Sequence, residues 1–157
     1  SRINDDSISK ISDIVADSNC SYTKEIRLDL SSVPPFVAGP NSVKVITSAP
    51  KLERKRIAIQ KAYIVSCVNS RVGDLAEAAN ILRGKQVSDD VQLFIAAASS
   101  EVEEESTKRG DFSALLEAGA IALPPGCGPC IGMGRGVLKE NEVGISATNR
   151  NFKGRMG

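Results

Sequence analysis

Apolar residues recur along this chain at two spacings, which predict alternating strands and helices. Continuous β-rich apolar runs predict strands at residues 56–66, 91–98, 120–123 and 143–147. Apolar and capping patterns predict helices at residues 74–82, 100–109 and 112–118. We therefore expect an α/β fold with three layers, in which a mainly parallel sheet is flanked by helices.

Capping and stop residues support the predicted helix ends. Ser100 followed by Glu103 is a capping-box pattern at the start of a charged helix, and Asp111 is a candidate N-cap for the next one. Gly84 and Gly119 follow apolar periodic segments and are typical stop signals.

The first third of the chain has a different pattern. Residues 1–24 are polar with weak helical spacing at Ile8, Ile11 and Ile14, which predicts a short helix or a partly ordered lead-in. Three prolines and a glycine in residues 28–40 exclude a regular helix and predict an extended segment with turns. We therefore divide the chain into a lead-in and connector at residues 1–55 and an α/β domain at residues 56–157.

Composition narrows the class of protein. The chain has 157 residues, a one-domain length, with 41% hydrophobic and 25% charged residues, which is ordinary for a soluble globular protein. Its formal charge of +1 and the lack of an apolar run of about 20 residues favour neither a nucleic-acid nor a membrane partner. Its start does not resemble a signal peptide, and its four cysteines do not suggest a secreted disulfide scaffold, so we expect a reducing compartment.

Three cysteines follow predicted strands. Cys67 comes after the first strand, Cys127 and Cys130 come after the third, and residues 148–150 come after the fourth. In open α/β sheets, ligands bind outside the carboxyl ends of the strands. We therefore expect these segments to converge at one end of the sheet and to form a site there.

The donor set of three thiols limits the chemistry of that site. A structural zinc site normally has four ligands, so three thiolates form an incomplete zinc cage. Three thiolates do suit a cubane iron–sulfur cluster with one open iron, which can act as a Lewis acid. Cys20 lies in the polar lead-in and is a bystander in this interpretation, although it could be the fourth ligand of a zinc site.

Two other interpretations of the cysteine pair stay open. Cys127-Gly-Pro-Cys130 has the spacing of a thioredoxin-type redox pair, and a pair of inert loop cysteines is also possible. Gly132, Gly134 and Gly136 oppose the helix that a thioredoxin site needs after its first cysteine, and no proline follows Pro129. The glycines form only a weak nucleotide-binding pattern, and we interpret them as a flexible turn near the cysteines.

Charged residues complete the candidate chemistry. Arg150 and Arg155 form either a solvated basic tail or a clamp for carboxylates, which guanidinium groups bind with two hydrogen bonds. The acidic residues 101–105 are expected on the exposed face of a helix. The sequence contains no histidine, so a general base near neutral pH must be a perturbed side chain of another type or lie elsewhere in a larger protein.

Three blocks of this sequence together resemble the aconitase superfamily. They are residues 62–70, with Ser-Cys67-Val-Asn69; residues 126–132, with Cys127-Gly-Pro-Cys130; and residues 146–155, with Asn149-Arg150-Asn-Phe-Lys-Gly-Arg155. Their order, content and approximate spacing agree with the superfamily over residues 28–157, most strongly from Tyr63 onward. The chain is most similar to the third domain in the fungal homoaconitase branch, with aconitase and the large subunit of isopropylmalate isomerase as alternatives.

The resemblance implies a cofactor and roles for individual residues. It implies a 4Fe–4S cluster held by Cys67, Cys127 and Cys130, substrate binding by Arg150 and Arg155, and cluster-facing positions for Asn69 and Asn149. Two residues depart from the family pattern: Val68 stands where threonine is usual, and Val65 stands where a small residue is usual. Neither departure removes a ligand.

The resemblance also implies a reaction. A homoaconitase is a hydro-lyase that reversibly dehydrates and hydrates a small tricarboxylate, here homoisocitrate and cis-homoaconitate, in lysine biosynthesis in the mitochondrial matrix. In the superfamily the base is a serine on a separate domain, so we expect no catalytic residue in this chain, an inactive isolated fragment, and the remaining domains of a longer enzyme as partners. A dithiol redox or metal-binding module and a purely structural module are the alternatives from other classes.

Overall fold

The computed structural model describes residues 14–157, which fall into two units divided between Val33 and Pro34. Ile8 and Ile11 of the predicted lead-in helix lie outside the described residues. Residues 14–33 are exposed and contain one 3-10 turn, η1 (Leu30–Ser32), in which the Asp29 carboxylate accepts a hydrogen bond from the Ser31 backbone. The domain boundary predicted at residue 55 stays a prediction.

The second unit, residues 34–157, begins with a hairpin inside the predicted connector. Strands β1 (Phe36–Ala38) and β2 (Ile46–Ser48) pair antiparallel, and the short helix α2 (Ala49–Glu53) follows. The carboxy-terminal tail contacts this hairpin, because Asn151 Nδ2 donates to the Ala38 carbonyl at 3.0 Å. The hairpin therefore fixes the tail that carries the two arginines.

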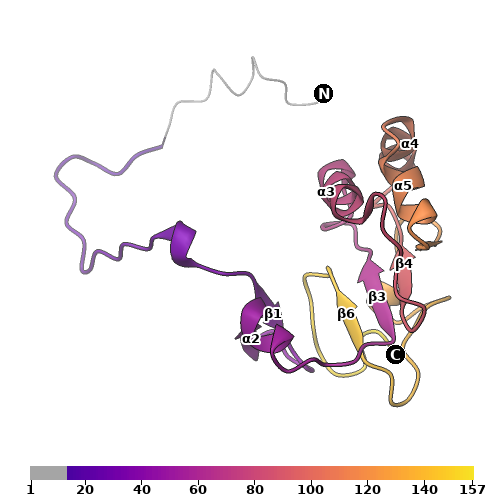
Figure 1. Cartoon of the computed structure of the whole chain (residues 1–157). Helices are drawn as coiled ribbons and strands as arrows, with labels where there is room; N and C mark the ends of the chain where they lie inside the picture. Colours follow the sequence, from indigo (N-terminus) through magenta and orange to yellow (C-terminus); the bar gives the residue numbers. More distant parts are fainter. Residues whose placement is uncertain (1–13) are drawn as a thin grey trace. The chain divides into compact units, whose positions relative to one another are not determined.

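The main sheet has four strands and is entirely parallel (Figure 1). Its strands are β3 (Lys61–Ile64), β4 (Gln92–Ile95), β5 (Ile121–Ala122) and β6 (Gly144–Ser146), in the order β5-β4-β3-β6. The strand predicted at residues 56–66 is shorter in the structure. Arg56 has a φ of 47°, which does not fit an extended strand, and pairing with β4 begins only at Lys61.

Three helices cover one face of this sheet. They are α3 (Val72–Leu82), α4 (Ser100–Lys108) and α5 (Asp111–Glu117), and none of the helices in residues 14–157 could cross a membrane. Leu75 of α3, Ile95 of β4 and Leu115 of α5 are fully buried in the core between helices and sheet. Parallel strands and flanking helices confirm the predicted three-layer α/β fold.

The opposite face of the sheet is covered by segments from the loops. Tyr63, Val65 and Phe94 alternate with the helix-facing residues along β3 and β4, and they pack with residues from after β5 and β6. These packed residues are Leu123, Cys130, Leu138 and Met156. The second core therefore holds one of the candidate ligands.

Two predicted helix caps are wrong. Ser99, not Ser100, caps α4, because its hydroxyl accepts a hydrogen bond from the Val102 backbone. Asp111 lies inside the first turn of α5, after Gly110. Its buried carboxylate instead pairs with Arg109 at 2.9 Å and Arg83 at 3.4 Å. Both guanidinium groups come from preceding helix ends, so the ion pairs compete with the cap.

Candidate functional site

The loops that carry the cysteines are both attached to the end of β4. The Ala98 backbone donates to the Ser70 carbonyl at 2.9 Å, and the Gly126 backbone donates to the Ala97 carbonyl at 2.9 Å. Ser70 ends the loop that contains Cys67, and Gly126 precedes Cys127. Ala97 and Ala98, adjacent residues just after β4, thus anchor both cysteine loops at the carboxyl end of the sheet, as the strand order led us to expect.

A sharp backbone turn presents Cys67. Val65 is buried, whereas Ser66 has a φ of 130°, a conformation that side chains other than glycine rarely adopt. The Ser66 hydroxyl accepts a hydrogen bond from the Val68 backbone at 3.1 Å and stabilises the turn. Cys67 is consequently exposed and its thiol is free.

Asn69 connects the Cys67 loop to the end of β6. Its side-chain nitrogen donates a hydrogen bond to the Ala147 carbonyl. The next residue, Thr148, is held by its backbone hydrogen bond to the Ser146 hydroxyl at 3.1 Å. The predicted site residues Asn149 and Arg150 follow directly, so the Asn69 contact brings two of the three sequence blocks together.

The two cysteines of the pair differ in burial. Cys127 is exposed, whereas Cys130 is buried in the second core with 6% of its surface accessible. Cys130 lies in a single 3-10 turn, η2 (Pro129–Ile131), which ends at Gly132 with a φ of 75°. A helix does not continue from this turn, which is the outcome that the glycines predicted.

Arg155 lies beside the turn that follows Cys130. A Cβ atom on Gly132 would be 3.0 Å from the Arg155 carbonyl oxygen, so only glycine allows this approach without a shift. The Arg155 guanidinium lies 5.3 Å from the centre of the Phe152 ring, and its Nε is buried without a hydrogen-bond partner among residues 14–157. A buried donor without a partner is costly, and a carboxylate is a suitable acceptor.

A partly buried ion pair at the start of β3 was not predicted from the sequence. Lys61 Nζ lies 2.5 Å from Glu142 Oε2 and donates to the Val137 carbonyl at 2.7 Å, and the Lys61 side chain is only 5% exposed. The hydrogen bond from Lys61, and then that from the Lys139 backbone, lowers the pKa of Glu142. A lysine inside an apolar run was the available signal, because buried charges require a partner.

Tyr63 adds a second contact to the same segment. Its hydroxyl donates to the Gly136 carbonyl at 2.7 Å. Burial of the ring, and then the charge of Glu142, raises the pKa of Tyr63 to about 12. Tyr63 is therefore a neutral hydrogen-bond donor at physiological pH.

Two hollows lie away from the cysteines. A groove of about 530 Å³ is apolar and is lined by α3, β3 and β6, including Ile81 and Ile145. A second hollow of about 360 Å³ lies on α4 and is lined by Ser100, Glu103, Glu104, Thr107 and Lys108.

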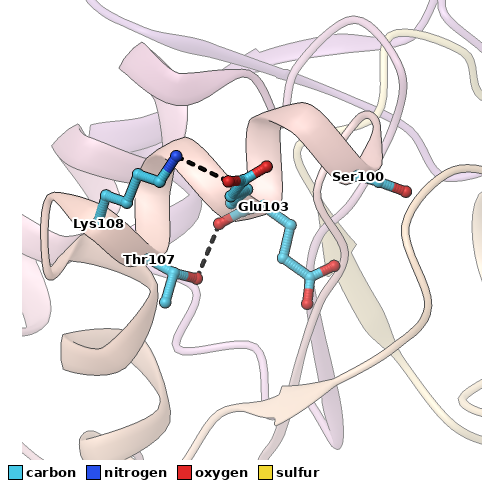
Figure 2. Close-up of a pocket in the computed structure, with 5 residues that line it drawn as sticks. Ser100, Glu103, Thr107 and Lys108 are labelled. Atoms are coloured by element: carbon cyan, nitrogen blue, oxygen red, sulfur yellow. Dashed lines mark hydrogen bonds and ion pairs between the residues drawn. The ribbon is translucent and has the colours of Figure 1, made fainter.

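Figure 2 shows two interactions within α4 among the residues that line its hollow. Lys108 pairs with Glu104 at 2.7 Å, and the Thr107 hydroxyl donates to the Glu103 carbonyl at 2.7 Å. Three of the acidic residues in 101–105 are exposed, which confirms the predicted exposed face. Neither hollow contains a candidate ligand.

Comparison of the sequence with known proteins identifies a family. The model of the aconitase family (aconitate hydratase) matches residues 4–157. This chain belongs to the aconitase family.

Three similar relatives are mitochondrial homoaconitases of fungi. The chain is 58% identical to that of Cryptococcus neoformans var. neoformans serotype D over 144 residues, which is 92% of this chain and 20% of the relative. It is 57% identical to that of Mycosarcoma maydis over 141 residues, covering 90% and 19%. It is 50% identical to that of Candida albicans over 158 residues, covering 99% and 23%. The chain thus spans about a fifth of the length of these relatives.

The aconitase family generally binds a 4Fe–4S cluster, and the donor chemistry of this chain fits one. All three candidate ligands are free thiols, on two loops anchored to adjacent residues after β4. The buried Arg155 Nε beside the Cys130 turn is a ready donor to an anionic group. Residues 14–157 contain no ready-made group of three or more potential ligands positioned around a metal ion. The assignment of Cys67, Cys127 and Cys130 as ligands stays a prediction.

Proposed function

We propose that this chain is the cluster-binding part of a homoaconitase, a hydro-lyase that acts on a small tricarboxylate. The observation that carries the proposal is the meeting of three sequence blocks at one end of the sheet. Ala97 and Ala98 anchor the two cysteine loops, and Asn69 joins one of them to the segment that leads to Arg150. The relatives named homoaconitase support the choice within the family.

In this proposal, the thiols of Cys67, Cys127 and Cys130 hold the cluster. When bound, a 4Fe–4S cluster with one iron free of protein thiolate supplies a Lewis acid for a substrate hydroxyl. Two of the thiols are exposed and one is buried, so Cys130 gives the site a fixed side against the core. Asn69 and Asn149 occupy cluster-facing positions.

The arginines bind and orient the substrate in this proposal. Arg155 has a buried Nε–H without a partner, and Arg150 is an exposed cation shortly after the Asn69 contact. Guanidinium groups bind carboxylates with two parallel hydrogen bonds, which fixes the orientation of the bound acid. We assign no catalytic residue to this chain and place the general base on the remaining domains of a longer enzyme. The isolated chain should therefore not turn over substrate.

The same proposal places the longer enzyme in lysine biosynthesis in the mitochondrial matrix. The word "mitochondrial" in the names of the homoaconitase relatives supports the mitochondrial location. Homoisocitrate and cis-homoaconitate are the proposed substrate pair.

Anaerobic reconstitution with iron and sulfide tests the ligand assignment. After reconstitution, the unsubstituted chain should show the visible absorption of an iron–sulfur cluster. The variants Cys67→Ser, Cys127→Ser and Cys130→Ser should each lack this absorption. Cys20→Ser is the matched control, because Cys20 is an exposed free cysteine in the other unit and should be dispensable. Equal iron and absorption in the Cys67→Ser chain would show that the assignment is wrong.

A further inference from the structure

The ion pair of Lys61 and Glu142, which we call the clasp, holds both sides of Leu138. Lys61 Nζ donates to the carbonyl of Val137, the residue before Leu138. Glu142 Oε2 accepts a hydrogen bond at 2.7 Å from the backbone of Lys139, the residue after it. Because the two clasp side chains also bond to each other, they fix the backbone on each side of Leu138.

Leu138 connects the clasp to the carboxy-terminal tail. Its backbone donates to the Met156 carbonyl at 2.7 Å. Arg155 is the residue before Met156, and its carbonyl lies against Gly132. A continuous set of contacts thus runs from the clasp to the arginine and to the turn that follows Cys130.

Leu138 also packs against the apolar core that contains Cys130. Leu138 and Met156 both pack against this second core, which contains Cys130, Tyr63 and Phe94. Cys130 therefore shares this core with Leu138 and Met156, as well as with residues of the sheet and Leu123. Movement of residues 137–139 would withdraw Leu138 from this core and would loosen the packing around Cys130.

The energetics favour a local opening when the clasp is broken. Removing Glu142 leaves the buried Lys61 ammonium without its counter-charge, and removing Lys61 leaves the partly buried Glu142 carboxylate without its partner. Both changes are destabilising. Residues 137–143 form no helix or strand among the described elements, whereas the α-helix face of the sheet keeps its own core. The least costly response is release of the 137–143 segment rather than unfolding of the sheet.

We propose that Lys61 and Glu142 are positioning residues that hold Cys130 and Arg155 in place through Leu138 and Met156. The importance of this positioning for cluster and substrate binding rests on the proposed function. The positioning of Cys130 and Arg155 does not, because it concerns only contacts within this chain.

Alkylation of the cysteines in the iron-free 157-residue chain tests the proposal. Mass spectrometry of peptides gives a separate rate for each thiol, so exposed Cys67 serves as an internal standard. In the unmodified chain Cys130 should react more slowly than Cys67 and Cys127. Lys61→Met should raise the Cys130 rate about tenfold or more while Cys67 is unchanged.

Two further variants separate positioning from general stability. Lys61→Arg keeps the charge and the donors and should restore a rate within about threefold of the original. Lys108→Met removes an exposed ion pair on α4 and should leave all rates unchanged. A folded Lys61→Met chain with an unchanged Cys130 rate would overturn the proposal.

Glu142→Gln covers the case in which Lys61→Met fails to fold. Glutamine keeps an acceptor for Lys61 and Lys139 but loses the charge, so the fold should persist and the Cys130 rate should rise about threefold or more. An unchanged Cys130 rate in this folded variant, or equal acceleration of Cys127 and Cys130 with loss of circular dichroism, would overturn the proposal.

Reconstitution separates this inference from the proposed function. If the alkylation rates of Cys130 are as expected but iron and sulfide give no cluster, the proposed function is wrong and the positioning role still holds. A chain that gains a cluster, while its clasp variants show the original Cys130 rate and cluster spectrum, would remove only the positioning.

Discussion

Asn69 Nδ2 donates a hydrogen bond to the Ala147 carbonyl. This bond joins the loop after β3 to the segment after β6, which are far apart in the sequence. The contact crosses from the end of β3 to the end of the neighbouring strand β6. It explains how the Cys67 block and the arginine block share one end of the sheet. Asn69 therefore has a structural role that its sequence position does not reveal.

Replacement of Asn69 by alanine should loosen this connection. The free energy of unfolding should fall by about 1 kcal/mol, the typical net value of one intramolecular hydrogen bond. Urea denaturation followed by circular dichroism measures the change. Asn80→Ala on the exposed face of α3 is the control and should change stability by less than about 0.5 kcal/mol. Equal losses in the two variants would contradict a specific role for Asn69.

Gly132 and Gly134 offer a matched test of the contact with Arg155. Their φ angles are 75° and 73°, but an added Cβ would meet the Arg155 carbonyl only at Gly132 and would meet nothing within 4 Å at Gly134. Each alanine substitution should cost about 1 kcal/mol for the backbone conformation. Gly132→Ala should cost about 1 kcal/mol more, because the tail must shift.

Nuclear magnetic resonance can locate that shift. The signals of the Phe152 ring, which lies under the Arg155 guanidinium, should change in Gly132→Ala and stay in place in Gly134→Ala. Identical spectra and equal unfolding free energies for the two variants would refute the predicted contact.

The lowered pKa of Glu142 predicts that the folded protein loses stability in acid. Its pKa is lowered in the folded protein, mainly by the Lys61 hydrogen bond, so the folded state favours the carboxylate more than the unfolded state does. This contribution is present above the unfolded pKa of 4.5 and is lost as the pH falls through the lower folded pKa. Melting temperatures measured on both sides of this window should fall less in Glu142→Gln than in the original chain.

The raised pKa of Tyr63 predicts that the folded protein loses stability in alkali. Its pKa is raised from 10.0 to about 12, so the folded state retains the phenolic proton longer than the unfolded state. The contribution is present below pH 10 and is lost as the pH rises toward about 12. Tyr63→Phe removes the titrating group, and its stability should decline less over this range.

The sequence alone determined the class of fold and the family. Alternating apolar runs and helical spacings are local properties, so they predicted the parallel sheet, its helices and the end of the sheet where the cysteine loops are anchored. The three sequence blocks predicted the aconitase family, and the family model confirms it. The roles of the three cysteines are predictions that reconstitution tests, and substrate binding by the two arginines stays a prediction.

Only the tertiary structure decided which polar groups pair. Ser99 caps α4 instead of Ser100, and Asp111 pairs with two arginines instead of capping α5. Lys61 and Glu142 meet although 81 positions separate them in the chain, and Arg155 is left with a buried donor beside the Cys130 turn. Local spacing carries no information about such partners, because a buried charge can be satisfied by any group that the fold brings within reach.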